Sequence, residues 1–342
     1  MRHRSMGWGI ILLCALVSAA CGSGTSQSTS PTFTSVPLTP TLPTAPGGTV
    51  SATIPSVGGE ITPSYLYGMD ADDTAVWVHN SEQGTVLRVD PTTNKVVATI
   101  PVGHGLGDLR LGDGAIWVSN HDDSTISRID PETNQVVATI ALPPPTGFLA
   151  VSPGAVWVAS KGNNVVMKID PQTNQVVATI SDPYGPSWMG YSAGSLWICN
   201  HDSALGVIRL DPMTNQVLAQ IDIGSARGYF CGGLAATDAG VWAMLLDNTQ
   251  NFDLGLVRID PATNQVIATT TLPQSMVTDA LAADAQGVWV AEPDLGLFRI
   301  SPQTNQAVGL LPMTRGAGVA LGAGSVWLAI SGGTLLRITP AS

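Results

Sequence analysis

Short apolar runs recur along the chain, and many of them are built around a tryptophan. The run 115–120, Ala-Ile-Trp-Val-Ser-Asn, is rich in β-branched and aromatic residues and is too short for a globular helix. A small and apolar run at 106–111 precedes it, and the runs 125–130 and 135–140 follow it. Turn-forming residues separate these runs. The pattern predicts a unit of four consecutive β-strands.

This unit occurs seven times. Its tryptophans are spaced 40, 40, 40, 45, 47 and 38 residues apart, at Trp77, Trp117, Trp157, Trp197, Trp242, Trp289 and Trp327. About ten residues after each comes a second element, which reads Arg-Ile-Asp-Pro or a close variant, as at 128–131. A period near 40 with several short strands per unit is typical of a propeller rather than a helical solenoid. We therefore predict an all-β fold, a seven-bladed β-propeller over residues 48–342.

The connection after each Arg-x-Asp strand has the composition of a tight turn. In Asp130-Pro131-Glu132-Thr133-Asn134 the aspartate can accept from a backbone N–H two residues on, proline fixes φ, and asparagine tolerates a positive φ. A calcium loop would need more carboxylates at alternating positions. A hairpin turn is favoured. The repeated tryptophan, which lies mid-strand among β-branched residues, is interpreted as packing between blades.

The seventh unit lacks its outer strand, because only Ala341 and Ser342 follow Thr339-Pro340. The segment 48–54, Gly-Thr-Val-Ser-Ala-Thr-Ile, resembles the outer strand at 94–100, Asn-Lys-Val-Val-Ala-Thr-Ile. We expect residues 48–54 to complete the last blade. Such strand exchange removes two open sheet edges.

The N-terminus resembles an export signal. Arg2 and Arg4 precede an uncharged apolar run, Met6 to Ala20, that is shorter than the roughly 20 residues of a membrane-spanning helix. A signal peptide over 1–20 is favoured over a permanent membrane helix. Val-Ser-Ala-Ala-Cys at 17–21 resembles the bacterial lipobox, which implies lipidation of Cys21 and a lipid anchor in a cell membrane, outside the cytoplasm.

The segment 21–47 is predicted to be a disordered stalk. Of residues 22–47, 20 of 26 are Ser, Thr, Pro or Gly, and none is charged. Such a segment cannot bury enough apolar area to offset its ordering entropy.

Acidic residues outnumber basic ones, 25 to 14, and removal of Arg2 and Arg4 with the signal leaves 25 against 12, a net charge of −13. Nucleic acids are bound through clustered Lys and Arg, so they are excluded as partners. Electrostatic docking on anionic lipid is excluded for the same reason. We expect a monomer that binds a protein or a small molecule, and no cofactor.

The strand ending in Val-x-Asn, followed by Arg-Ile-Asp-Pro-x-Thr-Asn-x-Val-Val-Ala-Thr-Ile-x-Val-Gly, resembles the YVTN-type propeller repeat. It is also similar to the streptogramin lyase (virginiamycin B lyase) superfamily of seven-bladed propellers. That resemblance implies a carbon–oxygen lyase that linearises a cyclic depsipeptide, with a divalent metal, a His at the start of an inner strand and a Glu at the end of the following strand. The candidates here are His104 and Glu292, but they lie in different units, and residues 276–278 hold no histidine. A non-enzymatic ligand- or protein-binding module is therefore favoured over the lyase, and a surface sensor would need a second protein to transmit its signal.

Irregular residues gather at one end of the units. In a propeller, the loops that join blades and the ends of the tryptophan strands share one face, whereas the Asp-Pro-x-Thr-Asn turns occupy the other. Taken singly, each histidine on this face is more simply a polar loop residue, but together they indicate a binding mouth. The predicted ligand-binding face comprises His79, His104, His121, Tyr184, Trp188, His201, Arg227, Tyr229, Phe230, Glu292 and Arg315. His79, His104 and His121 are weak candidates for a metal site, because they lack the close spacing of a zinc motif.

Two cysteines remain in the mature domain once Cys14 leaves with the signal and Cys21 carries lipid. Cys199 ends the tryptophan strand of the fourth unit, and Cys231 begins the inner strand of the fifth, so both should lie on the same face in neighbouring blades. A disulfide is favoured in an oxidising compartment, and two buried free thiols are the alternative.

Overall fold

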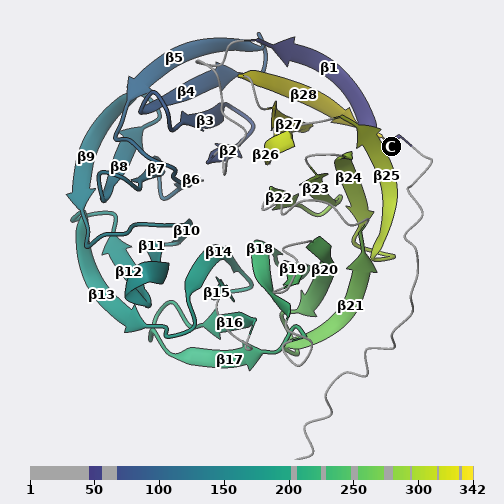
Figure 1. Ribbon diagram of the computed structural model, residues 1–342. Coiled ribbons are helices and arrows are strands. Elements are labelled where there is room, and N and C mark those ends of the chain that lie inside the picture. The colour runs from purple at the N-terminus through teal and green to yellow at the C-terminus, as the bar shows by residue number, and fades with distance from the viewer. Residues whose placement is uncertain are drawn as a thin grey trace, which may run out of the picture. The chain divides into compact units, whose positions relative to one another are not determined.

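The computed structural model describes residues 46–55, 68–201, 206–224, 229–247, 253–272, 280–292, 295–313, 316–330 and 333–341. They form seven four-stranded antiparallel sheets arranged as the blades of a ring (Figure 1), so the predicted seven-bladed β-propeller is confirmed. The predicted signal peptide, Cys21, most of the stalk, Arg227 and Arg315 lie outside the described residues.

In blades 1 to 6 the strands run from the axis outward in chain order. Blades 1 and 2 contain β2 (Met69–Ala71), β3 (Val76–Asn80), β4 (Thr85–Asp90) and β5 (Lys95–Pro101), then β6 (Leu109–Gly112), β7 (Ala115–Asn120), β8 (Thr125–Asp130) and β9 (Gln135–Ala141). Blades 3 and 4 contain β10 (Leu149–Ser152), β11 (Ala155–Ser160), β12 (Val165–Asp170) and β13 (Gln175–Ser181), then β14 (Pro186–Ser192), β15 (Ser195–Asn200), β16 (Val207–Leu210) and β17 (Val217–Ile221). Blades 5 and 6 contain β18 (Tyr229–Thr237), β19 (Gly240–Asp247), β20 (Asp253–Asp260) and β21 (Gln265–Thr271), then β22 (Leu281–Ala283), β23 (Val288–Glu292), β24 (Gly296–Ser301) and β25 (Gln306–Pro312).

Blade 7 closes the ring with a strand from the other end of the described chain. It contains β26 (Gly316–Gly322), β27 (Ser325–Ile330) and β28 (Thr334–Pro340), and its outer strand is β1 (Gly48–Ile54). The predicted strand exchange is thus confirmed, and Figure 1 shows purple β1 beside yellow β28. The two described residues before the predicted strand also make backbone contacts: the Gly47 N–H donates to the Leu310 carbonyl at 3.1 Å, and Pro46 bridges to Leu310.

The repeated tryptophans are buried between the blades, as the sequence predicts. All seven are at most 2% exposed. Trp197 of blade 4, for example, belongs to an apolar cluster that includes Val241 and Val257 of blade 5. A Lys or Arg of the adjacent strand in the same blade lies over each indole, 5.0 to 5.7 Å from the ring centroid.

The same cations fasten each blade to the next one. Arg88 of blade 1 donates from Nη1 to the Pro131 carbonyl at 2.8 Å and to Asn134 Oδ1 at 3.0 Å, both in a turn of blade 2. Arg337 of blade 7 makes the equivalent bond to the Pro91 carbonyl of blade 1 at 2.5 Å, so the pattern continues across the closure. The turn prediction is also confirmed, because the six asparagines of these turns have φ between 54° and 60°. The repeated motif therefore builds each turn and ties neighbouring blades together.

Helical structure is minimal in the described part of the chain. One helix is present there, the three-residue 3₁₀ turn η1 (Lys161–Asn163) of blade 3. No described helix has the length and apolar character that crossing a membrane requires.

Candidate functional site

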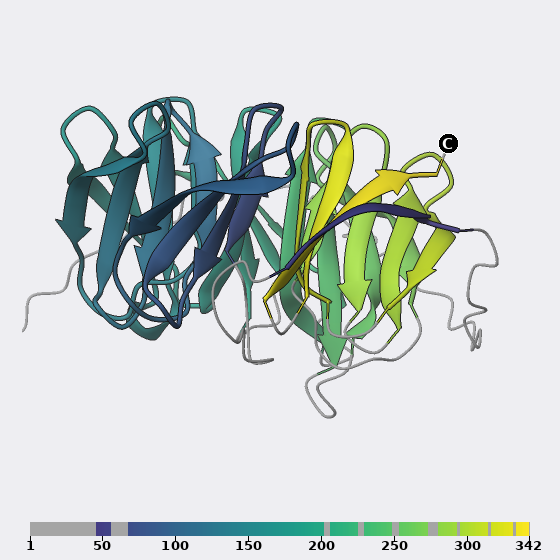
Figure 2. The same cartoon turned by 90° about the horizontal axis from the view of Figure 1, so that it is seen from above.

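The two faces of the propeller differ in their connections. The turns that lead into the tryptophan strands and the Asp-Pro-x-Thr-Asn turns gather on one face, which is uppermost in Figure 2. The ends of the tryptophan strands and the loops that join blades lie on the other face, as the antiparallel order of the strands requires. The candidate site lies on this second face, called the loop face below.

Four aromatic side chains from three adjacent blades form a continuous row on the loop face. Phe148, just before β10 of blade 3, lies 4.6 Å from Trp188 of β14 in blade 4, measured between ring centroids. Trp188 lies 6.2 Å from His201, which follows β15, and His201 lies 4.5 Å from Phe230 of β18 in blade 5. We call these four residues the aromatic row. Trp188 and His201 are partly exposed, which leaves apolar ring surface for a ligand.

A cation borders the aromatic row. Lys161 Nζ, from η1 of blade 3, lies 2.8 Å from His201 Nδ1. A lysine ammonium has only donors, so the imidazole nitrogen accepts this bond. The row therefore combines ring faces with a positive charge at one edge.

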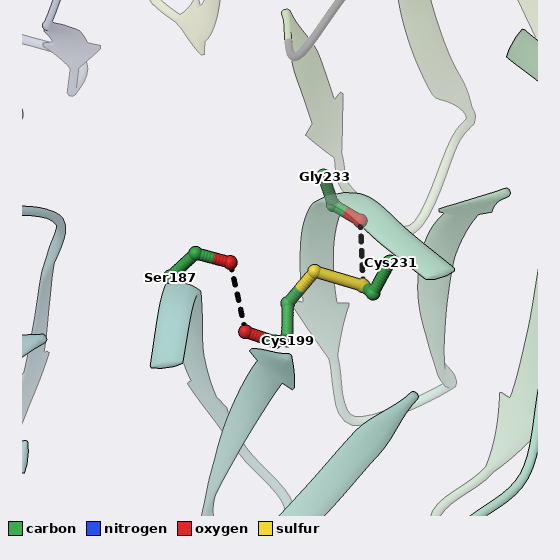
Figure 3. The surroundings of a disulfide bond; sticks show 4 residues. All are labelled: Ser187, Cys199, Cys231 and Gly233. Carbon is green, nitrogen blue, oxygen red and sulfur yellow. Dashed lines mark hydrogen bonds between the residues drawn. A yellow bond between two sulfur atoms is a disulfide. The ribbon is translucent and has the colours of Figure 1, made fainter. Parts of the chain in front are cut away.

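A disulfide underlies one end of the row. Cys199 of β15 and Cys231 of β18 are bonded, with a Cα–Cα distance of 5.5 Å, and both are fully buried. Ser187 Oγ donates to the Cys199 carbonyl at 2.8 Å, which ties the inner strand of blade 4 to the same point (Figure 3). His201 is two residues after Cys199, and Phe230 directly precedes Cys231, so the bond holds these two members of the row together.

Tyr184 and Tyr229, both predicted for the binding face, are half-buried beside the row. Tyr184 packs on the apolar cluster between blades 3 and 4, which Phe148 also contacts. Tyr229 packs on the cluster between blades 4 and 5, together with Trp188. They form part of the support beneath the row.

His79 lies inside the protein, not on the accessible face where the sequence placed it. Its side chain is 1% exposed, and burial lowers its pKa to about 4, although an interaction with the Gly107 backbone opposes the shift. Its imidazole is therefore neutral at physiological pH. The expectation was wrong because β3 continues to Asn80, so His79 is a strand residue that faces a neighbouring blade.

The three histidines proposed as metal ligands do not form a metal site. His104 Nδ1 lies 3.6 Å from Asp123 Oδ2, and His121 Nδ1 lies 3.3 Å from Asp122 Oδ1, both exposed at the rim of blade 2. His79 is buried in strand β3 of blade 1, at 1% exposure. No group of three or more His, Cys, Asp or Glu side chains suited to a metal ion occurs among the described residues.

The two lyase candidates are separated across the ring. His104 lies in the loop before β6 of blade 2, whereas Glu292 ends β23 of blade 6, on the other side of the axis in Figure 1. Glu292 is also fully buried. An acid and a base must reach one substrate together, so these two residues do not form a catalytic pair.

The sequence analysis missed a charged cluster on the inner strands, which it described as small and apolar. Arg110 Nη1 lies 2.7 Å from Asp108 Oδ1. Asp70 Oδ2 accepts from the Leu111 N–H of blade 2, and Asp108 Oδ2 accepts from the Leu149 N–H of blade 3, each at 2.9 Å. Burial raises the pKa of both carboxyls, and Arg110 opposes the shift. These charges join blades 1, 2 and 3 near the axis. In the sequence they could have been recognised as isolated charged residues within otherwise apolar runs.

Comparisons with known proteins show the fold. A family described as a repeat of unknown function (DUF6923) matches residues 39–164. The fold is similar to a structure titled streptogramin B lyase (TM-score 0.68, 15% identity, covering 85% of this chain and 97% of that one). It is also similar to hydrazine synthase of Kuenenia stuttgartiensis (0.67, 15%, 80% and 93%) and to the WD40 domain of Pan2 from Neurospora crassa (0.67, 12%, 89% and 98%). No curated protein matches the sequence. The predicted resemblance to streptogramin lyase-like propellers is thus confirmed for the fold.

Proposed function

We propose that this protein is a binding module that recognises a ligand or a protein partner on its loop face, at the aromatic row. The observation that carries the proposal is the row itself, because four rings from three blades lie in sequence on one face. The disulfide and the packed tyrosines support it, since a preformed apolar surface loses little entropy on binding. Lys161, at the edge of the row, favours a partner with a carboxylate or another anionic group near its apolar part.

The proposal includes attachment at a membrane on the outside of a bacterial cell. Cys21 in its lipobox-like context would carry the lipid, and residues 22–47 would form the tether. No metal or cofactor is part of this function. The lyase alternative has the shared fold in its favour, and fold alone does not specify chemistry.

Replacing both Trp188 and His201 with alanine is expected to weaken ligand binding by roughly 30-fold or more, because aromatic residues at the centre of a contact account for about 2 kcal/mol or more of binding free energy. The protein is immobilised and incubated with the source organism's extract, and each retained molecule is quantified. The matched control replaces Thr133 and Thr173, which are exposed on the turns of the opposite face. Loss of binding in the threonine variant, with retention in the Trp188/His201 variant, would show that the ligand binds the opposite face and would refute the proposed site.

Replacing Cys21 with serine is expected to abolish metabolic labelling of the protein with radioactive palmitate and to move it from the membrane fraction to the soluble fraction. A serine hydroxyl cannot form the thioether on which lipoprotein maturation depends. Cys14→Ser, in the predicted signal peptide, is the control and should keep both label and location. Full labelling of Cys21→Ser would refute Cys21 as the site of lipidation, and absence of label from the wild type would refute the lipid anchor. Neither result would affect the binding site.

A further inference from the structure

A cavity of about 230 Å³ lies between blades 3 and 4, and none of the four residues of the aromatic row lines it. Its buried wall is apolar and comes from both blades: Val166, Ile198, Ile208 and Leu210 are at most 3% exposed. It reaches the surface beside exposed side chains of the two outer strands, Ser181, Val217 and Gln220. The loop between the blades, Asp182-Pro183-Tyr184, completes the lining.

Asp182 occupies a position that is apolar in the neighbouring repeats. Its backbone N–H donates to the Asn164 carbonyl at 2.8 Å, and the same bond is made by Val102 to Gly84 and by Leu142 to Ser124. Leu142 is 7% exposed and belongs to the apolar cluster between blades 2 and 3. Leu272 stands at this point of the sequence repeat in blade 5 and is likewise buried against blade 6. Between blades 3 and 4 the short polar side chain of Asp182 takes the place of this buried leucine.

The carboxyl of Asp182 is buried and incompletely bonded. The residue is 4% exposed, and its Oδ1 accepts from the Tyr184 N–H at 3.2 Å. No described residue donates a hydrogen bond to Oδ2. Burial raises the pKa of Asp182, and the Tyr184 bond offsets this only in part. A buried acceptor without a donor destabilises the folded state. A donor in the adjoining cavity would reach this oxygen once the Asp182 side chain turns toward the cavity that the residue lines.

We propose that the cavity binds a small monoamine, whose ammonium group pairs with Asp182 and whose apolar body lies between blades 3 and 4. An ammonium supplies both the missing donor and the countercharge, and such charge-assisted bonds are stronger than neutral ones. The apolar wall accounts for the rest of the ligand. A cavity of about 150 Å³ suffices for benzene, so this one has room for a ring that carries an aminomethyl group. No member of the aromatic row lines this site, although Tyr184 borders both, and the proposal does not rest on the function proposed for the row.

Benzylamine is the probe, titrated into the protein by isothermal titration calorimetry. Benzyl alcohol, its neutral analogue, and benzoate, its anionic analogue, are titrated in parallel. Benzylamine is expected to bind at one site, at least tenfold more tightly than benzyl alcohol, and benzoate is expected to show no binding.

Two substitutions at Asp182 distinguish the contribution of its charge to binding from that of the cavity volume. Asp182→Asn keeps the size but removes the charge, and should weaken benzylamine binding at least tenfold. Asp182→Leu restores the side chain of the neighbouring repeats, and should abolish binding while raising the melting temperature by about 2–4 °C. The charge-matched control is Glu132→Gln, on an exposed turn of the opposite face, which should bind benzylamine as the wild type does.

A third variant distinguishes this site from the aromatic row. Replacement of Trp188 and His201 with alanine should leave benzylamine binding unchanged, because neither residue lines the cavity. Three results would each overturn the proposal: no benzylamine binding to the wild type, equal binding of benzoate, or binding that survives in Asp182→Leu and is lost in the Trp188/His201 variant. Failure of the row to bind any partner would leave this site untouched.

Discussion

Deletion of residues 46–54 is expected to lower the melting temperature by at least about 10 °C. β1 pairs with β28 along its whole length, and Ile54 is buried at 6% exposure in the apolar cluster between blades 7 and 1. Loss of one such buried side chain costs about 2–5 kcal/mol, and each kcal/mol shifts the melting temperature of a domain of this size by about 2–4 °C. Differential scanning calorimetry measures the shift.

The control deletes residues 22–45, which precede Pro46, the first residue that the structure describes. It should change the melting temperature by less than about 1 °C, because it removes none of the described strand pairing. The protein that lacks residues 46–54 should also aggregate more readily than the control, since β28 then presents an unpaired edge. Equal shifts from the two deletions would show that β1 does not carry the closure.

The fold was predictable because each unit repeats similar strand and turn sequences. The short apolar runs, the aspartate that begins the turn in five of the units and the positive-φ asparagine all favour one blade, and seven copies give the ring. Even the closing strand could be recognised, because Val-Ser-Ala-Thr-Ile at 50–54 nearly copies Val-Val-Ala-Thr-Ile at 96–100. The inter-blade bonds of the arginines were not predicted, since Arg88 and Pro131 lie 43 residues apart and nothing local joins them.

The candidate site was less predictable for a physical reason. His79 was placed after its tryptophan strand, and Glu292 at the end of its strand, and both were assigned to an accessible face. In the second unit Ser119 stands where His79 does, and Asn120 stands where Glu292 does. Those equivalents are fully buried. Comparison at the same repeat position, rather than residue type, was the signal that could have corrected both assignments.

The aromatic row shows the complementary limit. Trp188, His201 and Phe230 stood out by chemistry, but Phe148 did not, because a phenylalanine before an inner strand is an ordinary core residue. Contact among the four depends on how blades 3, 4 and 5 rotate about the axis, and no short-range pattern contains that rotation. The same holds for the cavity beside Asp182, which exists only because two blades meet there.

Removal of the disulfide by Cys199→Ala together with Cys231→Ala is expected to cost about 3–4 kcal/mol of stability, because the bond closes a loop between residues 32 apart and restricts the unfolded chain. The melting temperature should fall by roughly 6–16 °C. Reductant should lower the melting temperature of the wild type toward that of the variant and leave the variant unchanged. Alkylation of both cysteines in wild-type protein unfolded without reductant, detected by mass spectrometry, would refute the bond.

The same variant also tests the link between the disulfide and the binding site. Cys199 lies two residues before His201, and Cys231 directly follows Phe230. Loss of the disulfide therefore allows the segments that hold these two rings to move apart. At a temperature well below that at which the variant unfolds, its ligand binding at the aromatic row should therefore be weaker than that of the wild type. Benzylamine binding at Asp182 should persist under the same conditions, because the cavity is formed by blades 3 and 4 and does not involve blade 5. A variant that loses stability but binds at the row with unchanged affinity would show that the packed tyrosines alone hold the rings in place.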